Sequence, residues 1–142
     1  MSIVHAPWWC IEMPDEWQAE EDDEDEVILI IDPDDLGELC ITAIKKQDGL
    51  IDKDELLEFA ADLIERRLTS TDVSIAGLAG IYFEYEQEGE AWREWYLTDG
   101  STMLYATYNC DSENAQIDAA VIDQMLESLV LVDNSEAAIE AE

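Results

Sequence analysis

Basic residues are scarce in this sequence. Six Lys and Arg stand against 37 Asp and Glu, which gives a formal net charge of −31. A chain with this charge repels nucleic acid and anionic lipid, and its six cations, scattered from Lys45 to Arg93, form no basic stripe. The composition therefore argues against a binder of nucleic acid or of membrane surfaces. It leaves basic proteins or cations as the partners that the chain would attract.

Three interpretations of the acidity remain open. It can be a solvated surface that keeps the protein soluble, an adaptation to a saline cytoplasm, or a recognition surface for a basic partner. The three Cys and five Trp of the sequence argue against salt adaptation.

Histidine is almost absent, since His5 is the only one. Nucleophilic triads and most zinc sites require a histidine, and this one lies in an N-terminal segment that we expect to be frayed or to cap an element. The sequence also contains no G-x-S-x-G, P-loop or G-x-G-x-x-G motif. We therefore expect no enzyme, no catalytic residues, no cofactor and no metal site.

Paired cysteines and long apolar runs are missing as well. Cys10, Cys40 and Cys110 are odd in number and far apart, and each lies in an apolar stretch typical of a strand, so we expect buried, reduced thiols. The N-terminus lacks the basic segment and apolar core of a signal peptide, and no run of 18 apolar residues exists. These features predict a cytoplasmic protein without a membrane span.

The stretch KKQDGLIDKDELLEFA, residues 45–60, resembles the second half of a calcium-binding EF-hand loop. With Gly49 at position 6 of the loop, positions 1 and 3 fall on Ile44 and Lys46, which cannot coordinate Ca²⁺. The same residues are fully explained as a helix start. Asp52 is the N-cap, Glu55 completes a capping box, and the apolar residues Ile51 and Leu56 form a hydrophobic staple.

Periodicity along the chain predicts an α+β fold with a mostly antiparallel sheet of about five to six strands and two main helices, an α/β/α sandwich. Apolar spacing indicates helices from Asp52 to about Arg67 and from near Ile117. Strands are expected at 8–14, at 27–31 and 38–44, and in a three-stranded meander over 79–110 that turns at Asp99-Gly100. We expect a single domain over 1–132 and an acidic C-terminal tail over 133–142.

The order of these elements resembles the PsbP/DcrB-like superfamily. The resemblance rests on Pro14 and Trp17 after the first strand, on WYLTDGSTMLYATYNC over 95–110 and on VIDQMLESLVL over 121–131, within residues 8–132. It implies a non-enzymatic scaffold that binds other proteins. Relatives include a photosystem extrinsic subunit, a regulator that binds the GTPase Ran, and adaptor chaperones that load type VI secretion effectors, and fold alone does not choose among these roles.

Seven consecutive carboxylates over 20–26 are the strongest candidate for a binding surface, and we expect them to form a solvated loop. With three further acids of the following hairpin they form a predicted docking patch for a basic protein: Glu20, Glu21, Asp22, Asp23, Glu24, Asp25, Glu26, Asp32, Asp34 and Asp35. Charge of this kind accelerates association with a cationic partner. A weak divalent-cation site is the alternative use of the same oxygens.

Aromatic residues of the meander form a second candidate. Trp95 and Tyr96 are adjacent on one strand and so point to opposite faces, which places both in the core only where both faces of the sheet are covered. Core packing is the favoured interpretation, and Trp92 or Trp95 is the candidate for an exposed anchor that contacts a partner.

The sequence thus predicts a non-catalytic, acidic protein-binding module: an adaptor, a chaperone or an immunity-like inhibitor of a basic partner protein. Two alternatives remain. A carboxylate-based hydrolase would use acids such as Glu84, Glu86 and Glu94, although with 37 acidic residues a pair on neighbouring strands is expected by chance. A weakly Ca²⁺-responsive module would use the loop that includes Asp48, Asp52 and Glu55.

Overall fold

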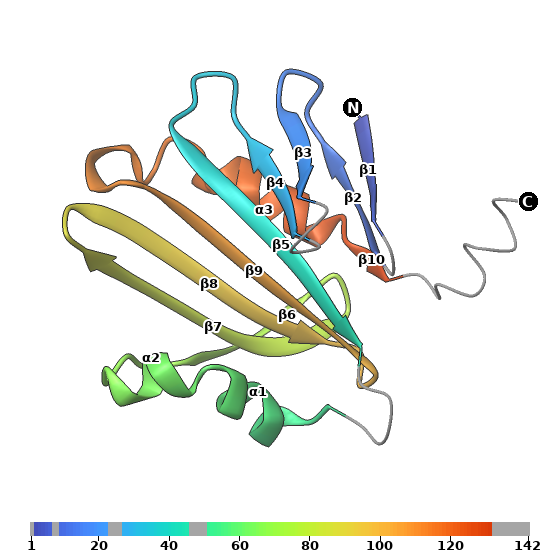
Figure 1. Cartoon of the computed structure of the whole chain (residues 1–142), viewed down its shortest axis with the longest axis vertical. Coiled ribbons are helices and arrows are strands. Elements are labelled where there is room, and N and C mark those ends of the chain that lie inside the picture. The colour runs from blue at the N-terminus through green and yellow to red at the C-terminus, as the bar shows by residue number, and fades with distance from the viewer. Residues whose placement is uncertain (1, 7–8, 23–26, 46–50, 132–142) are drawn as a thin grey trace, which may run out of the picture.

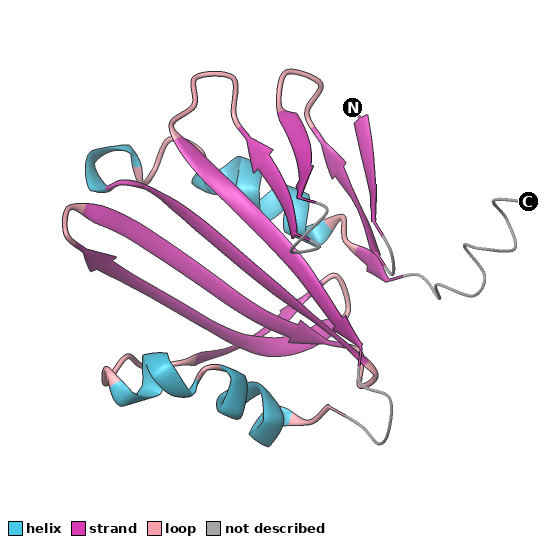
Figure 2. Cartoon of the chain, viewed as in Figure 1, coloured by secondary structure: helices cyan, strands magenta, loops and turns pink. Residues whose placement is uncertain are grey.

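A seven-stranded antiparallel sheet dominates the computed structural model, which describes residues 2–6, 9–22, 27–45 and 51–131 (Figures 1 and 2). The strand order in this sheet is β3-β4-β5-β9-β8-β7-β6. The strands are β3 (Gln18–Asp22), β4 (Val27–Ile31), β5 (Gly37–Lys45), β6 (Thr71–Ile75), β7 (Leu78–Gln87), β8 (Glu90–Thr98) and β9 (Thr102–Asp111).

A second, three-stranded sheet brings together segments from far apart in the sequence. Its order is β1-β2-β10, with β1 at Ser2–Ala6, β2 at Trp9–Met13 and β10 at Val130–Leu131. Val130 pairs with Cys10 and Leu131 pairs with Trp9. The backbone N–H of Glu12 also donates to the hydroxyl of Ser128 at 2.9 Å. The last described strand is therefore held against the second.

Two layers cover the two faces of the large sheet. Helices α1 (Lys53–Phe59) and α2 (Ala61–Glu65) lie on one side, while α3 (Ala119–Glu127) and the small sheet lie on the other (Figure 1). A short 3₁₀ helix, η1 (Ser112–Asn114), precedes α3. Because alternate residues of a strand point to opposite faces, Tyr96 enters the core beneath α1 and α2, while Trp95 enters the larger core beneath α3.

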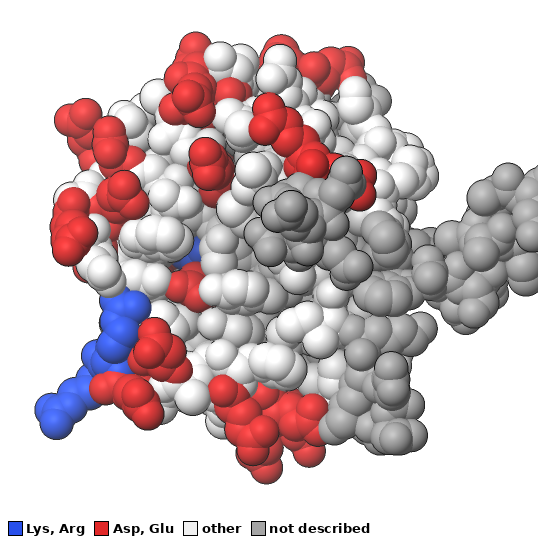
Figure 3. Space-filling view, in the orientation of Figure 1, with Lys and Arg blue, Asp and Glu red and all other residues white. Residues whose placement is uncertain are grey.

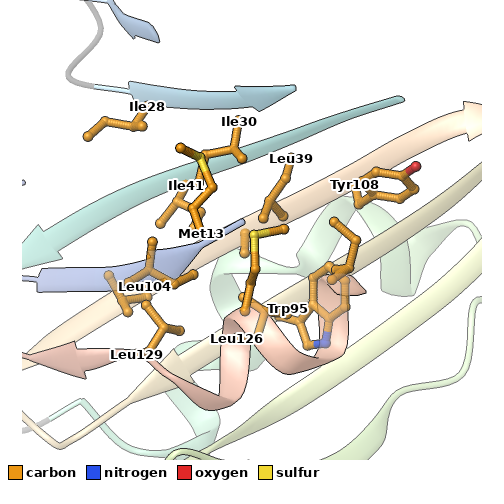
Figure 4. Packing of buried hydrophobic residues seen from close by; sticks show 14 of the residues in the cluster. Met13, Ile28, Ile30, Leu39, Ile41, Trp95, Leu104, Tyr108, Leu126 and Leu129 are labelled. Carbon is orange, nitrogen blue, oxygen red and sulfur yellow. The ribbon is translucent and has the colours of Figure 1, made fainter. Parts of the chain in front are cut away.

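The larger core is built from aliphatic and aromatic side chains of both sheets and α3 (Figure 4). The four apolar residues expected to form the stripe of the last helix are all buried: Ile122, Met125, Leu126 and Leu129. The smaller core contains Leu56, Ala60 and Leu63 of the helical segment, packed on Ile81 and Phe83 of β7. These contacts confirm the α+β class and the sandwich of layers.

Residues within the tight turns of the meander and at the start of α1 determine these structures, as expected from the sequence. Gly100 has a φ of 106°, and Oδ1 of Asp99 accepts the backbone N–H groups of Ser101 and Thr102, both at 2.9 Å. The β7–β8 turn places Glu88 and Gly89 at φ 53° and 82°, and such left-handed values favour glycine at the second position. Asp52 caps α1, since its Oδ1 accepts the N–H of Glu55 at 3.0 Å.

Several expectations are corrected by the structure. The large sheet has seven strands rather than five or six, and the leading strand β2 belongs to the separate sheet. The helix expected over 52–67 is broken at Ala60 into two short helices, and Ile64 is 41% exposed rather than part of the buried face. Strands β1, β3, β6 and β10 were not expected, because their exposed or short segments carry weak periodicity.

The prediction of a single domain over 1–132 stays a prediction, and the acidic tail at 133–142 lies outside the described residues. Within the described residues, no helix is both long and apolar enough to cross a bilayer.

Candidate functional site

The acidic run is only partly a loop. Glu20 and Glu21 lie on the edge strand β3 and are exposed, and Asp22 is the last residue of that strand, paired in register with Val27. The expectation of a loop is therefore wrong for these three residues. Asp23, Glu24, Asp25 and Glu26 lie outside the described residues. Carboxylates along an edge strand discourage pairing with another chain, so this edge is protected by charge.

Asp32 does not belong to the acidic surface, which corrects the expectation that it joins the exposed patch. It is only 5% exposed, and its Oδ1 accepts the backbone N–H groups of Leu36 at 2.7 Å and Gly37 at 3.3 Å. This carboxylate organises the turn between β4 and β5. The signal was present in the sequence, because an Asp directly before a Pro is a common first residue of a type I turn.

Asp34 and Asp35 are exposed at the tip of the same turn. They lie at the opposite end of β4 from Asp22, because Asp22 pairs with Val27 while the turn follows Ile31. Four residue steps of a strand separate these ends, which is about 13 Å. The exposed, described carboxylates that were expected to form one patch are therefore divided between strand β3, which pairs along β4, and the turn that follows β4.

Acidic side chains dominate the face of the molecule shown in Figure 3 and lie mostly towards its outline. The basic side chains of this face gather mainly at its lower left, where Figure 1 places α2. The acidity of this face is thus spread over several elements and is not confined to the run over 20–26.

Both large aromatic residues at the centre of β8 are buried. Trp95 is 2% exposed and Tyr96 is 5% exposed, on opposite faces of the sheet, because each face is covered. Trp95 is therefore a core residue and is not available as an exposed anchor. Trp92 is half-buried and stacks on Tyr85, with ring centroids 6.2 Å apart and an interplanar angle of 4°.

A guanidinium links α3 to the large sheet. Arg93 of β8 donates from Nη2 to Oδ1 of Asp123 at 2.7 Å and from Nε to the hydroxyl of Tyr82, also at 2.7 Å. Its guanidinium carbon, Cζ, lies 4.6 Å from the centroid of the Trp95 ring, within range of a cation–π interaction. Arg93 therefore stabilises the packing of α3 on the large sheet.

The most distinctive polar group of the interior is Glu94. It is 5% exposed, and its carboxylate accepts hydrogen bonds from tyrosines on three adjacent strands: Tyr85 of β7, Tyr96 of β8 and Tyr105 of β9. The Tyr105 hydroxyl lies 2.7 Å from Oε1 and the Tyr96 hydroxyl lies 3.2 Å from it, while Tyr85 donates to Oε2. We call these four residues the glutamate–tyrosine cluster.

The tyrosines of this cluster remain hydroxyl donors at neutral pH. Burial, with further contributions from the hydrogen bond and charge of Glu94, raises the pKa of Tyr85 to about 12. Burial likewise raises the pKa of Tyr96 and Tyr105, and the Glu94 carboxylate adds to both effects. A phenol that stays protonated beside a carboxylate is a stable donor, so the cluster keeps its geometry over the physiological range of pH.

Glu94 does not form the acid/base pair considered from the sequence. In the register of β7 and β8, Phe83 pairs with Glu94 and Glu84 pairs with Arg93. Because alternate residues of a strand point to opposite faces, Glu84 and Glu86 lie on the face opposite Glu94. Reasoning from the sequence also missed the tyrosine partners. The register implied by the two tight turns, which places Tyr96 opposite Tyr105 and Phe83 opposite Glu94, is the signal that could have identified them.

A second buried carboxyl lies at the start of α3. Asp118 is 8% exposed, and its Oδ2 accepts a hydrogen bond from the Tyr108 hydroxyl at 3.0 Å. Burial raises the pKa of Asp118, and the nearby negative charge of Asp32 raises it further. Gly37 passes close to the same hydroxyl, since a Cβ at that position would lie 2.5 Å from it.

The remaining candidates are placed as follows. His5 is an exposed residue of strand β1, opposite Cys10, rather than part of a frayed or capping segment. The three cysteines are unpaired. Cys110 is buried, whereas Cys10 and Cys40 are only half-buried. Among the described residues, no group of three His, Cys, Asp or Glu side chains is arranged to hold a metal ion.

Comparison with known proteins identifies the fold. No family model and no curated protein sequence matches the chain. Several solved structures are similar in fold, among them the following three. One is a Bacteroides thetaiotaomicron VPI-5482 protein with a TM-score of 0.65 and 18% identity, in which the match covers 88% of this chain and 45% of the other. This chain therefore spans less than half of that protein.

The second is the cyanobacterial PsbP protein CyanoP from Synechocystis sp. PCC 6803, with a TM-score of 0.63, 9% identity and coverage of 89% and 88% of the two chains. The third is LpqN, described as involved in cell envelope biogenesis of Mycobacterium tuberculosis, with a TM-score of 0.62, 13% identity and coverage of 92% and 90%. At these identities the likeness concerns the fold alone, and it supports the resemblance to PsbP-like proteins.

Proposed function

We propose that this chain is a non-catalytic protein-binding module that docks a basic partner protein, as an adaptor, a chaperone or an immunity-like inhibitor. The observation that carries the proposal is the imbalance between carboxylates and cations. The net charge is −31, and Lys53, Arg66 and Arg93 each contact other residues of this chain. A large excess of carboxylates is therefore available to a partner. The PsbP-like fold is compatible with this role.

The cations neutralise little of the surface. Lys53 pairs with Asp72 at 2.9 Å, and Arg93 pairs with Asp123 at 2.7 Å. Arg66 donates to Gln87, and its guanidinium lies 4.8 Å from the centroid of the Tyr85 ring. Each of these cations neutralises one carboxylate at most, so the electrostatic potential outside the molecule stays strongly negative.

A negative field of this kind favours encounter with a cationic protein. Electrostatic steering raises association rates by roughly one to three orders of magnitude at low salt, and the effect declines as salt screens the charges. Exposed carboxylates near β4 supply part of this field: Glu20 and Glu21 on the neighbouring strand β3, and Asp34 and Asp35 in the turn after β4. Trp92 is the remaining aromatic candidate for a contact residue.

The identity of the partner would distinguish the finer roles. An adaptor or chaperone, such as the type VI secretion adaptors suggested by the resemblance, would bind a protein that is later released. An inhibitor would cover the basic cleft of a nuclease or a similar toxin. The cytoplasmic location that we expect, with reduced thiols, belongs to the same proposal.

The test uses two variants with equal net charge. The patch variant carries Glu20→Gln, Glu21→Gln, Asp34→Asn and Asp35→Asn. The control variant replaces four exposed acids elsewhere: Glu58→Gln, Glu65→Gln, Glu88→Gln and Glu113→Gln. Proteins captured by each form from the native host are quantified at about 50 and 500 mM NaCl, where the screening length falls from roughly 14 Å to roughly 4 Å.

We expect a basic protein that binds the wild type at low salt, is released at high salt, and is captured poorly by the patch variant but normally by the control. The dissociation constant of the purified pair should then rise at least tenfold in the patch variant. Partners that stay bound at 500 mM NaCl, or that bind the patch variant as well as the wild type, would contradict docking through these charges.

The calcium-responsive alternative is tested separately by calorimetry with millimolar Ca²⁺. In the structure the Asp52 side chain caps α1, and residues 46–50 of the loop lie outside the described residues. Saturable heat that disappears in the Asp52→Asn variant would support that alternative. A linear heat of dilution would remove it.

A further inference from the structure

The carboxylate of Glu94 retains one unused acceptor position. A carboxylate offers about four positions for hydrogen-bond donors, two on each oxygen. Tyr96 and Tyr105 both donate to Oε1, whereas Tyr85 alone donates to Oε2. One position on Oε2 therefore remains for a single further donor. The three hydrogen bonds that the Glu94 carboxylate accepts come from tyrosine hydroxyl groups.

A pocket of about 340 Å³ leads to this carboxylate from the side of α2. Its walls include Ile44 of β5 and Phe59 of α1, which are 38% and 47% exposed, together with the buried residues Leu63 and Met103. Exposed apolar side chains at the mouth of a pocket with a charged floor suit a ligand with an apolar stem and a polar tip. A lysine side chain has this character.

The charges around the pocket sum to −1. Asp62 and Glu94 each contribute one negative charge, and Arg66 contributes one positive charge. The Arg66 guanidinium lies against the Tyr85 ring and donates to Gln87, and it also interacts with the Tyr85 hydroxyl, the group that donates to Oε2 of Glu94. Arg66 is also exposed, and solvent screens its repulsion of an incoming cation.

We infer that this pocket receives one lysine side chain of the basic partner. The ammonium donates to Oε2 of Glu94, and the methylene stem packs between Ile44 and Phe59. A single unused acceptor matches one ammonium N–H better than it matches the two-pronged donor face of a guanidinium. This inference rests on the proposed function and adds to it a specific point of recognition, distinct from the diffuse attraction of the surface carboxylates.

Another pocket, lined by residues of β7, β8 and α3, is a weaker candidate. It has a volume of about 430 Å³ and is lined by Arg93, but Glu84, Glu86 and Asp123 also line it. An anion would meet these three carboxylates, and a cation would meet Arg93, which lies between them. The glutamate–tyrosine cluster offers a cation a carboxylate whose recorded partners are all uncharged.

The experiment uses n-butylammonium chloride as the probe, since it reproduces the lysine side chain, and n-butanol as the matched uncharged probe. Ring signals of Tyr85, Tyr96 and Tyr105 are followed by NMR at constant ionic strength. We expect saturable shifts with butylammonium and at least tenfold weaker binding of butanol. The Glu94→Gln variant should bind butylammonium at least tenfold more weakly, and Arg66→Gln should bind it more tightly. Equal shifts with the two probes, or equal binding by wild type and Glu94→Gln, would overturn the inference.

Two further variants keep the test decisive. If Glu94→Gln fails to fold, Ile44→Lys replaces it. This exposed position carries an ammonium at the mouth of the pocket, and the variant should compete with the probe and weaken its binding. The patch variant defined above should bind butylammonium as the wild type does. Partner capture that is lost in the patch variant but unchanged in Glu94→Gln would reject the pocket and retain the proposed function. If butylammonium binds but no basic protein is captured, the pocket is retained as a cation site and the proposed function is rejected.

Discussion

The hydroxyl of Tyr105 donates to Oε1 of Glu94 at 2.7 Å, from β9 to the neighbouring strand β8. Tyr85 donates to the same carboxylate from β7. One buried side chain therefore links three consecutive strands of the meander beneath the short helices. A slip of one residue in any of these strands would turn a tyrosine to the opposite face and leave the carboxylate short of a donor, so the cluster fixes the register as well as contributing stability.

We predict that Tyr105→Phe lowers the free energy of unfolding by about 1.5–3 kcal/mol, the usual range for a hydrogen bond to a charged group. Chemical denaturation measures the change. The control is the same substitution in a Glu94→Gln background, where the loss should be clearly smaller because the acceptor is neutral. Equal losses in the two backgrounds would show that Tyr105 acts through packing alone.

Asp118→Asn should raise the free energy of unfolding at pH values above the ordinary pKa of this carboxyl. Burial raises the pKa of Asp118 above its ordinary value of 3.8, so between these two pKa values the folded state holds a proton that the unfolded chain has released. Stability from this carboxyl is therefore greatest below about pH 4 and declines as the pH rises through the raised pKa. The asparagine side chain does not titrate, so this pH-dependent loss of stability disappears, and its amide oxygen can still accept the hydrogen bond from the Tyr108 hydroxyl.

Thermal unfolding between pH 4 and 8 checks the prediction, with Glu113→Gln as the control, because Glu113 is exposed just before the same helix. The wild type and the control should lose stability in parallel over this range, while Asp118→Asn should lose less. A lower melting temperature of Asp118→Asn at pH 7 would contradict the assignment.

Replacing the helix cap should have a local effect. Asp52→Ala removes the acceptor for the N–H of Glu55 and should lower the free energy of unfolding by about 1 kcal/mol, whereas Asp52→Asn should change it little. Asp54→Ala, in the exposed first turn, is the matched control for the loss of one carboxylate. A loss in Asp54→Ala equal to that in Asp52→Ala would indicate a general charge effect instead of capping.

Salt should stabilise this protein. A net charge of −31 destabilises the compact state through self-repulsion, and ions screen that repulsion. We expect the melting temperature to rise by several degrees between about 50 and 500 mM NaCl, and to rise equally in KCl, because screening depends on ionic strength. A rise specific to one cation would instead indicate a specific site for that ion.

Much of the fold follows from local patterns in the sequence. The two meander turns are specified by Asp99-Gly100 and by Gly89, and the start of α1 is specified by Asp52 and its neighbours. In each case the residues that determine the structure are adjacent in the sequence. The same is true of α3, whose apolar spacing places Ile122 and Leu126 on one face.

Features that depend on distant contacts were not predictable in this way. Strand β10 has two residues, and β3 carries carboxylates, so neither shows the alternation of a typical strand. The helical segment breaks at Ala60 although its apolar spacing is continuous. The glutamate–tyrosine cluster combines residues 85, 94, 96 and 105, which become neighbours only when the register of both hairpins is known.

The pairing of β2 with β10 has a consequence for biosynthesis. Trp9 and Cys10 leave the ribosome early, yet their partners Leu131 and Val130 are among the last described residues to be made. The hydrogen-bonding edge of β2 that faces β10 therefore stays unpaired with its native partner until residues 130 and 131 have been translated. The small sheet can therefore be completed only at the end of synthesis of the described residues, after the hairpins of the large sheet have been made.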